Sequence, residues 1–561
     1  MISCRDLSYY YEGENGLVPA INHLSLDIVR GEYVAIMGPN GSGKSTLAKI
    51  IAGLITPQKG SFLFDNYNIN DEKNAHRILE NTAIVFQNPD NQIVSMTVEA
   101  EIAFPLENLN LPQKDIRKRV DILLEAFELE HLAIRPPQSL SGGERQRVAI
   151  SSVLSAGKQC LILDEPTSLL DPSGRVEIIH LLNELHQGKT ANGDSFAYIP
   201  QPLTTIHITQ FPEEALYAER LIILDEGKAI YDGVPEQIFK RIFDDGYKGV
   251  SVPKLLKTRF LAEKNKTDKN TGIFAKPPVE NNRANEKSIY KLNNIDYSYR
   301  LPWGEHIPAL RDVNCEIGRQ RITGIIGSNG SGKTSLAKIL SFLYRQEKGN
   351  LMFEGKEIPV SQYKDEKRKV SLSFQFPEKQ FFCNTVFEEI AFGLKLRGIS
   401  ESEIEDRVKR SLDLVGLDYD KFYKRDPFTL SGGEKRKVGI AIALSLDAEV
   451  LIFDEPTSGL DGESQNYLIN LISKLKMEGI TIIVISHNIE FILSICDDVL
   501  VLTDGTVRVF TSTAKILSET SNLSNYGLPL TPYIEFVTEG AKKYQVKLNH
   551  LPTPEKAYML F

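Results

Sequence analysis

The stretch GPNGSGKST at positions 38–46 decides the fold, because it fits the phosphate-loop pattern G-x-x-x-x-G-K-[ST]. An apolar run at 33–37 precedes it and a helical pattern at 47–51 follows, which predicts a loop between a buried parallel strand and a helix. Glycines let backbone N–H groups approach phosphate oxygens, the lysine reaches the β- and γ-phosphates, and the next hydroxyl binds Mg²⁺. The phosphate-binding residues expected here are Gly38, Pro39, Asn40, Gly41, Ser42, Gly43, Lys44, Ser45 and Thr46.

A second phosphate loop, GSNGSGKTS at 327–335, lies in the same context, and three further motifs recur 288 to 290 residues along the chain. They are FQNPDNQ at 86–92 (FQFPEKQ at 374–380), LSGGERQRVAI at 140–150 (LSGGEKRKVGI at 430–440) and LILDEPTSLLD at 161–171 (LIFDEPTSGLD at 451–461). A period this long indicates a duplicated domain rather than a solenoid. The second loop is expected to bind phosphate through Gly327, Ser328, Asn329, Gly330, Ser331, Gly332, Lys333, Thr334 and Ser335.

The duplication predicts an α/β fold class with two P-loop NTPase domains in tandem. Residues 261–287 are rich in Lys, Asn and Glu, contain a Pro-Pro pair and lack apolar periodicity, which indicates a flexible linker. The expected boundaries are 1–240 for the first domain, 241–287 for its C-terminal segment with the linker, 288–515 for the second domain, and 516–561 for its C-terminal segment.

Composition excludes several classes of protein. The 561 residues carry 65 Lys and Arg against 74 Asp and Glu, and the net charge of −9 disfavours a general nucleic-acid binder. The five cysteines are scattered without a CxxC pair, so neither a disulfide framework nor a zinc site is expected. No apolar run is long enough to cross a bilayer and no signal peptide follows Met1, so we expect a cytoplasmic chain without a transmembrane segment.

A pair of acids ends a buried apolar strand in each copy: Asp164 with Glu165, and Asp454 with Glu455. The aspartate is placed to act on Mg²⁺, and the glutamate can polarise an attacking water as a general base. A solvated acidic loop is the ordinary alternative, and it is disfavoured because a phosphate loop lies upstream in both copies.

The motif LSGGE at 140–144 and 430–434, set between a phosphate loop and a DEPT strand, resembles the signature of the ATP-binding-cassette ATPases. The resemblance covers the chain except the linker, and it implies a helical subdomain in each cassette. It also implies that the two cassettes pair head to tail, so that Lys44 works with Ser431 and Lys333 with Ser141. The signature residues expected to contact ATP are Ser141, Gly142, Gly143, Ser431, Gly432 and Gly433.

Other positions match the family residue by residue. Gln87 and Gln375 match the Q-loop glutamine, which senses Mg²⁺ and the transmembrane partner. Tyr11 and Tyr299 lie where an aromatic ring stacks on adenine; a strand aromatic is the alternative, and the run Tyr9–Tyr11 leaves the choice of tyrosine open. Together with the loop hydroxyls and the strand-end aspartates, the expected Mg²⁺ residues are Ser45, Gln87, Asp164, Thr334, Gln375 and Asp454.

The copies differ at the family's switch histidine, which contacts the γ-phosphate. The second copy has His487 there, whereas the first has Gln210 and carries His207 three residues earlier, inside the predicted strand. An amide can donate a hydrogen bond but cannot carry positive charge, and losing one transition-state donor costs about 10²–10³ in rate. We therefore expect faster hydrolysis at the site of Glu455 and His487 than at that of Glu165 and Gln210; the alternative is that Gln210 is an adequate substitute.

The segments after the two Q-loop glutamines, 86–112 and 374–400, share one register and resemble those of the energy-coupling-factor (ECF) importers of vitamins and transition-metal ions. In that family FQNPD-type and FQFPE-type ATPases form an unequal pair, and this chain carries both types. The resemblance implies ATP and Mg²⁺ as ligands and a peripheral position at the cytoplasmic face of the membrane.

The implied partners are a separate transmembrane scaffold and a membrane subunit that captures the substrate, with no nucleic acid. Asp90 and Glu378 are candidates to meet basic residues of such a scaffold, with a solvated acidic loop as the alternative. The alternative function is a soluble tandem cassette protein acting on the ribosome, for which a longer, basic, helical linker would be expected.

Overall fold

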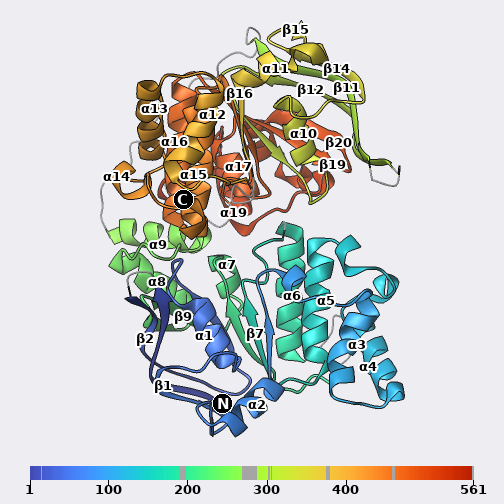
Figure 1. Ribbon diagram of the computed structural model, residues 1–561, viewed down its shortest axis with the longest axis vertical. Coiled ribbons are helices and arrows are strands. Elements are labelled where there is room, and N and C mark those ends of the chain that lie inside the picture. Colours follow the sequence, from blue (N-terminus) through green and yellow to red (C-terminus); the bar gives the residue numbers. More distant parts are fainter. Residues whose placement is uncertain are drawn as a thin grey trace. The chain divides into compact units, whose positions relative to one another are not determined.

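The computed structural model describes residues 1–13, 16–170, 172–188, 198–267, 287–300, 304, 306–374, 380–457 and 462–558 (Figure 1). The chain divides into two compact units, Met1–Leu256 and Lys257–Phe561, and the division falls inside the predicted segment 241–287. Gln375 and Glu378 lie outside the described residues, as do 268–286 of the linker.

Two sheets build the described part of the first unit. One is antiparallel, with the order β2-β1-β4-β5; the other has the order β10-β9-β3-β8-β7-β6 and is parallel except for β10. The first sheet consists of β1 (Ile2–Gly13), β2 (Gly16–Ile28), β4 (Lys59–Phe64) and β5 (Tyr67–Asn68). The second consists of β3 (Tyr33–Met37), β6 (Thr82–Val85), β7 (Cys160–Asp164), β8 (Thr204–Ile208), β9 (Arg220–Asp225) and β10 (Lys228–Gly233).

The helices of the first unit include a helical subdomain whose buried side chains share one hydrophobic core with those of β6 and β7. Figure 1 shows α3, α4 and α5 side by side, and they contact one another. Val98, Ile102 and Leu106 recur every four residues on α3 and are fully buried, which is the pattern of an amphipathic helix facing a core. The helices are α1 (Lys44–Ile51), α2 (Glu72–Asn81), α3 (Val98–Asn108), α4 (Gln113–Ala126), α5 (Gly142–Ser155), α6 (Pro172–Gln187), α7 (Pro212–Ala215) and α8 (Pro235–Asp245).

The second unit repeats this architecture in its described residues, with sheet orders β12-β11-β14-β15 and β16-β17-β18-β13-β19-β20. Its strands are β11 (Ser288–Arg300), β12 (His306–Gly318), β13 (Ile322–Ile326), β14 (Lys348–Phe353), β15 (Lys356–Glu357), β16 (Val370–Ser373), β17 (Val450–Asp454), β18 (Thr481–Ile485), β19 (Asp498–Thr503) and β20 (Thr506–Ser512). Its helices are α10 (Lys333–Leu340), α11 (Tyr363–Glu366), α12 (Val386–Leu396), α13 (Glu401–Leu414), α14 (Tyr419–Phe422), α15 (Gly432–Ser445), α16 (Gly462–Met477), α17 (Ile489–Ile495), α18 (Thr513–Ser518), α19 (Pro532–Lys543) and α20 (Pro554–Ala557).

The central parallel strands position the predicted motifs. Every residue of β3, β7 and β8 is buried, as are those of β13, β17 and β18, because both faces of a parallel sheet are covered. In each unit these three strands are neighbours, so their carboxyl ends meet at one edge of the sheet. The phosphate loop, the acid pair and the switch position therefore come together.

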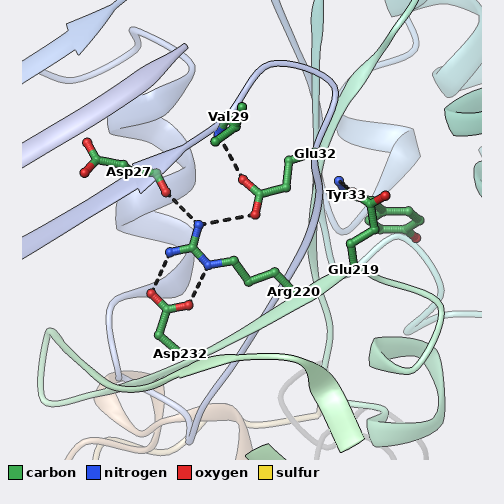
Figure 2. A network of polar contacts seen from close by, with 7 residues as sticks. All are labelled: Asp27, Val29, Glu32, Tyr33, Glu219, Arg220 and Asp232. Carbon is green, nitrogen blue, oxygen red and sulfur yellow. Dashed lines mark hydrogen bonds and ion pairs between the residues drawn. The ribbon is translucent and has the colours of Figure 1, made fainter. Parts of the chain in front are cut away.

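Arg220 forms hydrogen bonds with the residues just before β3, the strand that leads into the phosphate loop, as Figure 2 shows. Its guanidinium donates to the backbone oxygen of Asp27 at 2.8 Å, to Glu32 Oε1 at 3.2 Å, and in two bonds to Asp232 at 2.5 and 2.6 Å. Glu219, the residue before Arg220, accepts the Tyr33 N–H at 3.1 Å. The network thus ties β2, β9, β10 and the start of β3 together.

The C-terminal segments are helical. Helix α9 (Lys254–Thr267) crosses the division between the units, and Lys257 pairs with Glu555 of α20 at 2.5 Å within the second unit. Of the helices that the structure describes, none is long and apolar enough to cross a membrane.

Candidate active site

In each phosphate loop, two positions have a backbone conformation or a close contact that only glycine allows. Gly43 and Gly332 begin the loop helices with φ of 99° and 97°, in the left-handed region that favours glycine. A Cβ at Gly38 would lie 2.0 Å from the backbone oxygen of Leu224, and one at Gly327 would lie 2.2 Å from that of Leu502. The loops therefore pack tightly against β9 and β19, as a phosphate cradle requires.

The loop lysines point inward in both units. Lys44 Nζ donates to the backbone oxygens of Gly38 and Pro39, both at 2.9 Å, and Lys333 Nζ donates to those of Gly327 and Ser328 at 2.9 and 2.8 Å. Burial lowers the pKa of Lys44, while the nearby Glu165 and Asp164 act in the opposite direction. Each ammonium group thus lies inside its loop, where it can bind phosphate oxygens.

The hydroxyl and carboxylate predicted to hold Mg²⁺ are in contact in each unit. Ser45 Oγ donates to Asp164 Oδ1 at 3.1 Å, and Thr334 Oγ1 donates to Asp454 Oδ2 at 2.9 Å. Burial raises the pKa of Asp164, and it raises that of Asp454 to about 6. A buried carboxylate with a raised pKa is one that a nearby cation would stabilise in its charged form.

The chemistry of this donor set fits a hard cation that is shared with a phosphate ligand. The described residues contain no group of three or more His, Cys, Asp or Glu side chains that could hold a metal ion. One hydroxyl and one carboxylate leave most of an octahedral Mg²⁺ shell to phosphate oxygens and water. Within the described residues, Ser42 Oγ and Ser331 Oγ of the loops are also buried without a hydrogen-bond partner, so each loop offers a further unused polar atom.

The second acid of each pair has an uncommon backbone conformation. Glu165 and Glu455 have φ of 53° and 50°, and their N–H groups donate to the backbone oxygens of Ile208 at 3.0 Å and Ile485 at 2.9 Å. This turn places the carboxylates beside the ends of β8 and β18. Burial raises the pKa of Glu165, which suits a proton acceptor better than an ordinary surface glutamate.

The switch positions meet these glutamates in both units. Gln210 Nε2 donates to Glu165 Oε1 at 2.6 Å and to Asn40 Oδ1 at 3.3 Å. In the second unit, His487 Nδ1 lies 2.9 Å from Glu455 Oε1. Strand register supports the match, because Asp164 pairs with Ile208 and Asp454 with Ile485, two residues before Gln210 and His487.

His207 lies elsewhere, as expected of a packed strand residue. It is fully buried inside β8, its Nδ1 lies 3.2 Å from the Tyr33 hydroxyl, and burial lowers its pKa to about 3. It faces the interior rather than the phosphate loop.

The signature serines begin long helices. Ser141 and Ser431 cap α5 and α15, and each forms a capping box with the glutamate three residues later. The capping box occupies the N–H groups of the serine and the glutamate, and the N–H groups of the two glycines between them lie at the helix start, where an anion can bind. The S-x-x-E spacing at 141–144 is the signal from which the capping box could have been predicted.

A family model described as ABC transporter matches residues 21–168 and 310–458, which together make up more than half of the chain. The chain belongs to the ABC transporter family. Its two units are therefore tandem ATP-binding cassettes, and ATP binding with hydrolysis coupled to transport is the general activity of the family.

Relatives match along almost the whole chain. A candidate ABC transporter ATP-binding protein of Caldanaerobacter subterraneus is 32% identical in an alignment 554 residues long that covers 94% of each chain. A candidate HMP/thiamine import ATP-binding protein of Bacillus subtilis, YkoD, is 30% identical in an alignment 531 residues long that covers 93% of each chain. The solved structure of cbiO1 from Clostridium perfringens, part of an ABC transporter complex, is 30% identical with a TM-score of 0.39; it covers 45% of this chain and 100% of its own.

The predicted adenine tyrosines lie beside the phosphate-loop helices of the cassettes. The Tyr11 hydroxyl is 3.3 Å from Thr46 Oγ1, and the Tyr299 hydroxyl is 2.9 Å from Ser335 Oγ. Tyr11 is 42% exposed and packs edge-on against Tyr9. Of the three consecutive tyrosines, all within the described residues, Tyr11 is the one whose hydroxyl contacts the loop helix.

The Q-loop glutamine of the first cassette reaches the acid pair. Gln87 Nε2 donates to Glu165 Oε2 at 3.1 Å, so Glu165 accepts from both Gln87 and Gln210. The corresponding Gln375 lies outside the described residues.

Sequence reasoning missed four contacts around the acid pairs. Ser486 Oγ donates to Glu455 Oε2 at 3.3 Å, and the buried Arg436 donates to the backbone oxygen of Glu455 at 3.2 Å. In the first cassette Gln146 takes the place of Arg436, and Glu214 contacts both Thr167 and Thr209. The unlike residues at 146 and 436 were a visible signal of a difference between the copies.

Proposed function

We propose that this chain is the ATP-hydrolysing energy-coupling subunit of an ECF-type importer for a vitamin or a transition-metal ion. It would lie at the cytoplasmic face of the membrane and act through a separate transmembrane scaffold, with another membrane subunit capturing the substrate. The observation that carries the proposal is a pair of exposed apolar surfaces, one beside the Q-loop segment of each cassette.

In the first cassette this surface comprises Val94, Met96 and Phe104, which are 67%, 86% and 44% exposed. In the second it comprises Phe382, Phe392 and Leu396, which are 61%, 42% and 72% exposed, and the two phenyl rings pack edge-on at 4.7 Å. Contiguous exposed apolar side chains of this kind mark interaction sites. Val94 matches Phe382 and Phe104 matches Phe392 in the shared register, which favours one docking mode for two related helices of a partner.

The loops that carry Val94, Met96 and Phe382 are hydrogen-bonded to the helices that follow them. Glu101, which is 3% exposed, accepts the N–H groups of Val94 and Ser95 at 3.0 and 2.8 Å. Glu389, which is 5% exposed, accepts those of Phe382 and Cys383 at the same two distances. A preformed surface loses less conformational entropy when a partner binds.

ATP hydrolysis is proposed to use the residues as follows. The Glu165 or Glu455 carboxylate takes a proton from a water whose oxygen attacks the γ-phosphorus, while the bond to the β–γ bridging oxygen breaks and ADP leaves. Lys44 and Lys333 hold the phosphates, and Gln210 and His487 orient the carboxylate and face the γ-phosphate. Mg²⁺, held by Ser45 with Asp164 or by Thr334 with Asp454, would neutralise charge on the phosphates.

Each site is proposed to be completed by the signature of the other cassette, Ser431 for the Lys44 site and Ser141 for the Lys333 site. ATP binding then closes the cassettes, and hydrolysis with phosphate release reopens them. This cycle can drive a partner only because the closed and open states differ in their affinity for ATP.

The substrate class rests on the FQNPD and FQFPE segments and on YkoD, whose name refers to HMP/thiamine import. The ribosomal alternative finds no support among the relatives reported above.

The test is mass spectrometry of what co-purifies with the tagged chain from detergent-solubilised native membranes. We expect one polytopic scaffold and one small hydrophobic subunit, and we expect Met96→Glu to abolish their recovery. Met477→Glu is the control, because Met477 is a methionine of similar exposure (82%) at the end of α16 and belongs to neither Q-loop segment. Recovery of ribosomal proteins and RNA without a membrane partner would contradict the proposal.

A further inference from the structure

In the first cassette a buried carboxylate is hydrogen-bonded to the residue before Gln210, which occupies the switch position. Glu214, on α7, is 5% exposed; its Oε1 accepts from Thr167 Oγ1 at 2.7 Å and its Oε2 accepts from Thr209 Oγ1 at 2.6 Å. Thr167 follows Glu165 by two residues, and Thr209 directly precedes Gln210. One side chain therefore bonds to both segments that carry the groups facing the ATP site.

The contacts of Thr209 define the direction of its hydroxyl. Thr209 Oγ1 accepts the Phe211 N–H at 3.0 Å and gives its proton to Glu214. A hydroxyl has a single proton to donate, so this bond excludes a simultaneous bond from Thr209 to Glu165.

The second cassette uses the corresponding hydroxyl differently. Ser486 Oγ accepts the Asn488 N–H at 3.1 Å, as Thr209 accepts that of Phe211, but its proton points to Glu455 Oε2 at 3.3 Å. Phe491, which follows His487 by four residues as Glu214 follows Gln210, is 4% exposed. An apolar side chain at this position cannot accept a proton, so the Ser486 hydroxyl is available to the acid pair.

The strand residues beside Glu214 are polar, whereas those at the matching positions of the second cassette are apolar. His207 Nε2 lies 3.5 Å from Glu214 Oε2, and Tyr33 contacts His207; the matching strand positions in the second cassette are Val484 and Ile322. Burial raises the pKa of Glu214 to about 7 and lowers that of His207 to about 3. Keeping a carboxyl in such a place costs free energy unless its hydrogen bonds are satisfied, and the two threonines satisfy them.

We propose that Glu214 is a positioning residue of the first ATP site. It joins the segment after Glu165 to the segment before Gln210 and takes the Thr209 proton. Glu165 then receives its side-chain hydrogen bonds from Gln210 and Gln87, whereas Glu455 receives one from the Ser486 hydroxyl. This inference rests on the proposed role of Glu165 as general base.

The test compares Glu214→Ala, which removes both acceptors, with Glu214→Gln, which keeps a carbonyl acceptor and the shape of the side chain. We measure kcat and KM for ATP in the native chain and in the Glu455→Gln chain. If hydrolysis at one site requires hydrolysis at the other, the loss of kcat is seen in the native chain. If the two sites hydrolyse ATP independently, it is seen in the Glu455→Gln chain. Glu214→Ala is expected to lower kcat about tenfold or more with KM changed less than about twofold, whereas Glu214→Gln stays within about threefold of the parent. Glu213→Ala, on the same helix but exposed, is the matched control.

Unchanged kcat in a folded Glu214→Ala chain in both backgrounds would overturn the inference while leaving the proposed function intact. Thr209→Val removes one hydroxyl from the same contact at nearly constant volume, and it replaces Glu214→Ala if that variant does not fold; the same loss of kcat is expected. If Glu165→Gln leaves turnover unchanged in both backgrounds, the assignment of the site fails, and the positioning role of Glu214 fails with it.

Discussion

The amide of Gln210 donates to the Glu165 carboxylate at 2.6 Å, at the position where the second cassette sets His487 2.9 Å from Glu455. The two sites thus share a geometry and differ in chemistry, because an imidazole can become a cation and an amide cannot. A duplicated chain offers an internal comparison of the two groups.

Gln210→His restores the imidazole in the first cassette. We expect it to raise ATP turnover at that site by about tenfold or more, because a chargeable donor then faces the γ-phosphate. The measurement is kcat in the Glu455→Gln chain, with Gln210→Ala as the loss-of-donor control. No gain from histidine, together with no loss from alanine, would show that the switch position does not limit the first site.

Glu101→Ala should release the apolar loop of the first cassette without touching the ATP site. The N–H groups of Val94 and Ser95 lose their common acceptor, so their hydrogen exchange should accelerate and recovery of the membrane partner should fall. ATP affinity should stay within about twofold. Glu99→Ala, on the same helix, removes an exposed ion pair with Arg117 worth at most about 1 kcal/mol and should change neither. Unchanged exchange in Glu101→Ala would contradict the role of this carboxylate.

Arg220→Ala should destabilise the first unit. The variant leaves the Glu32 and Asp232 carboxylates without their shared cation. We expect the free energy of unfolding of the first unit to fall by about 1–3 kcal/mol, seen in calorimetry as a lower Tm for that unit. Arg220→Lys keeps the charge but loses the paired bonds to Asp232, so it should recover only part of the loss. Equal Tm values for the native and alanine chains would show that the network in Figure 2 contributes little.

Asp454 should make the stability of the second unit depend on pH. Burial raises its pKa in the folded chain from 3.8 to about 6, so the folded state binds this proton more tightly than the unfolded state. Its contribution to the free energy of unfolding is therefore fully present below pH 3.8 and is lost as the pH rises through 6, by about 3 kcal/mol at most.

The measurement is calorimetry of the nucleotide-free chain between pH 4 and pH 8 against Asp454→Asn, which does not titrate. The native Tm should fall relative to that of the variant as the pH rises. A constant difference across this range would mean that the carboxyl titrates normally.

Much of the fold and of the site follows from local sequence patterns. The loops at Lys44 and Lys333, the acid pairs and the unequal switch residues could be predicted, because each lies at a fixed distance from a buried apolar strand. The orientation of polar side chains within apolar surroundings could not. Glu101 shares a helix face with Val98 and Ile102, and that placement among buried residues was the one available sign that it points inward.

The contacts of Glu214 could not be predicted from the sequence for a different reason. The run PEEA at 212–215 has the composition of an exposed helix start, and only the tertiary fold brings Thr167 to the same carboxylate as Thr209. Contacts between segments far apart in the sequence have no signal in periodicity or motif spacing.

The most direct test of unequal ATP sites is the ATPase rate of Glu165→Gln against that of Glu455→Gln, each in the otherwise native chain. Glutamine keeps the size of the side chain and removes the proton acceptor. We predict that Glu455→Gln loses the larger share of turnover, because it removes the proton acceptor from the site that contains His487. Equal losses in the two variants would contradict the account.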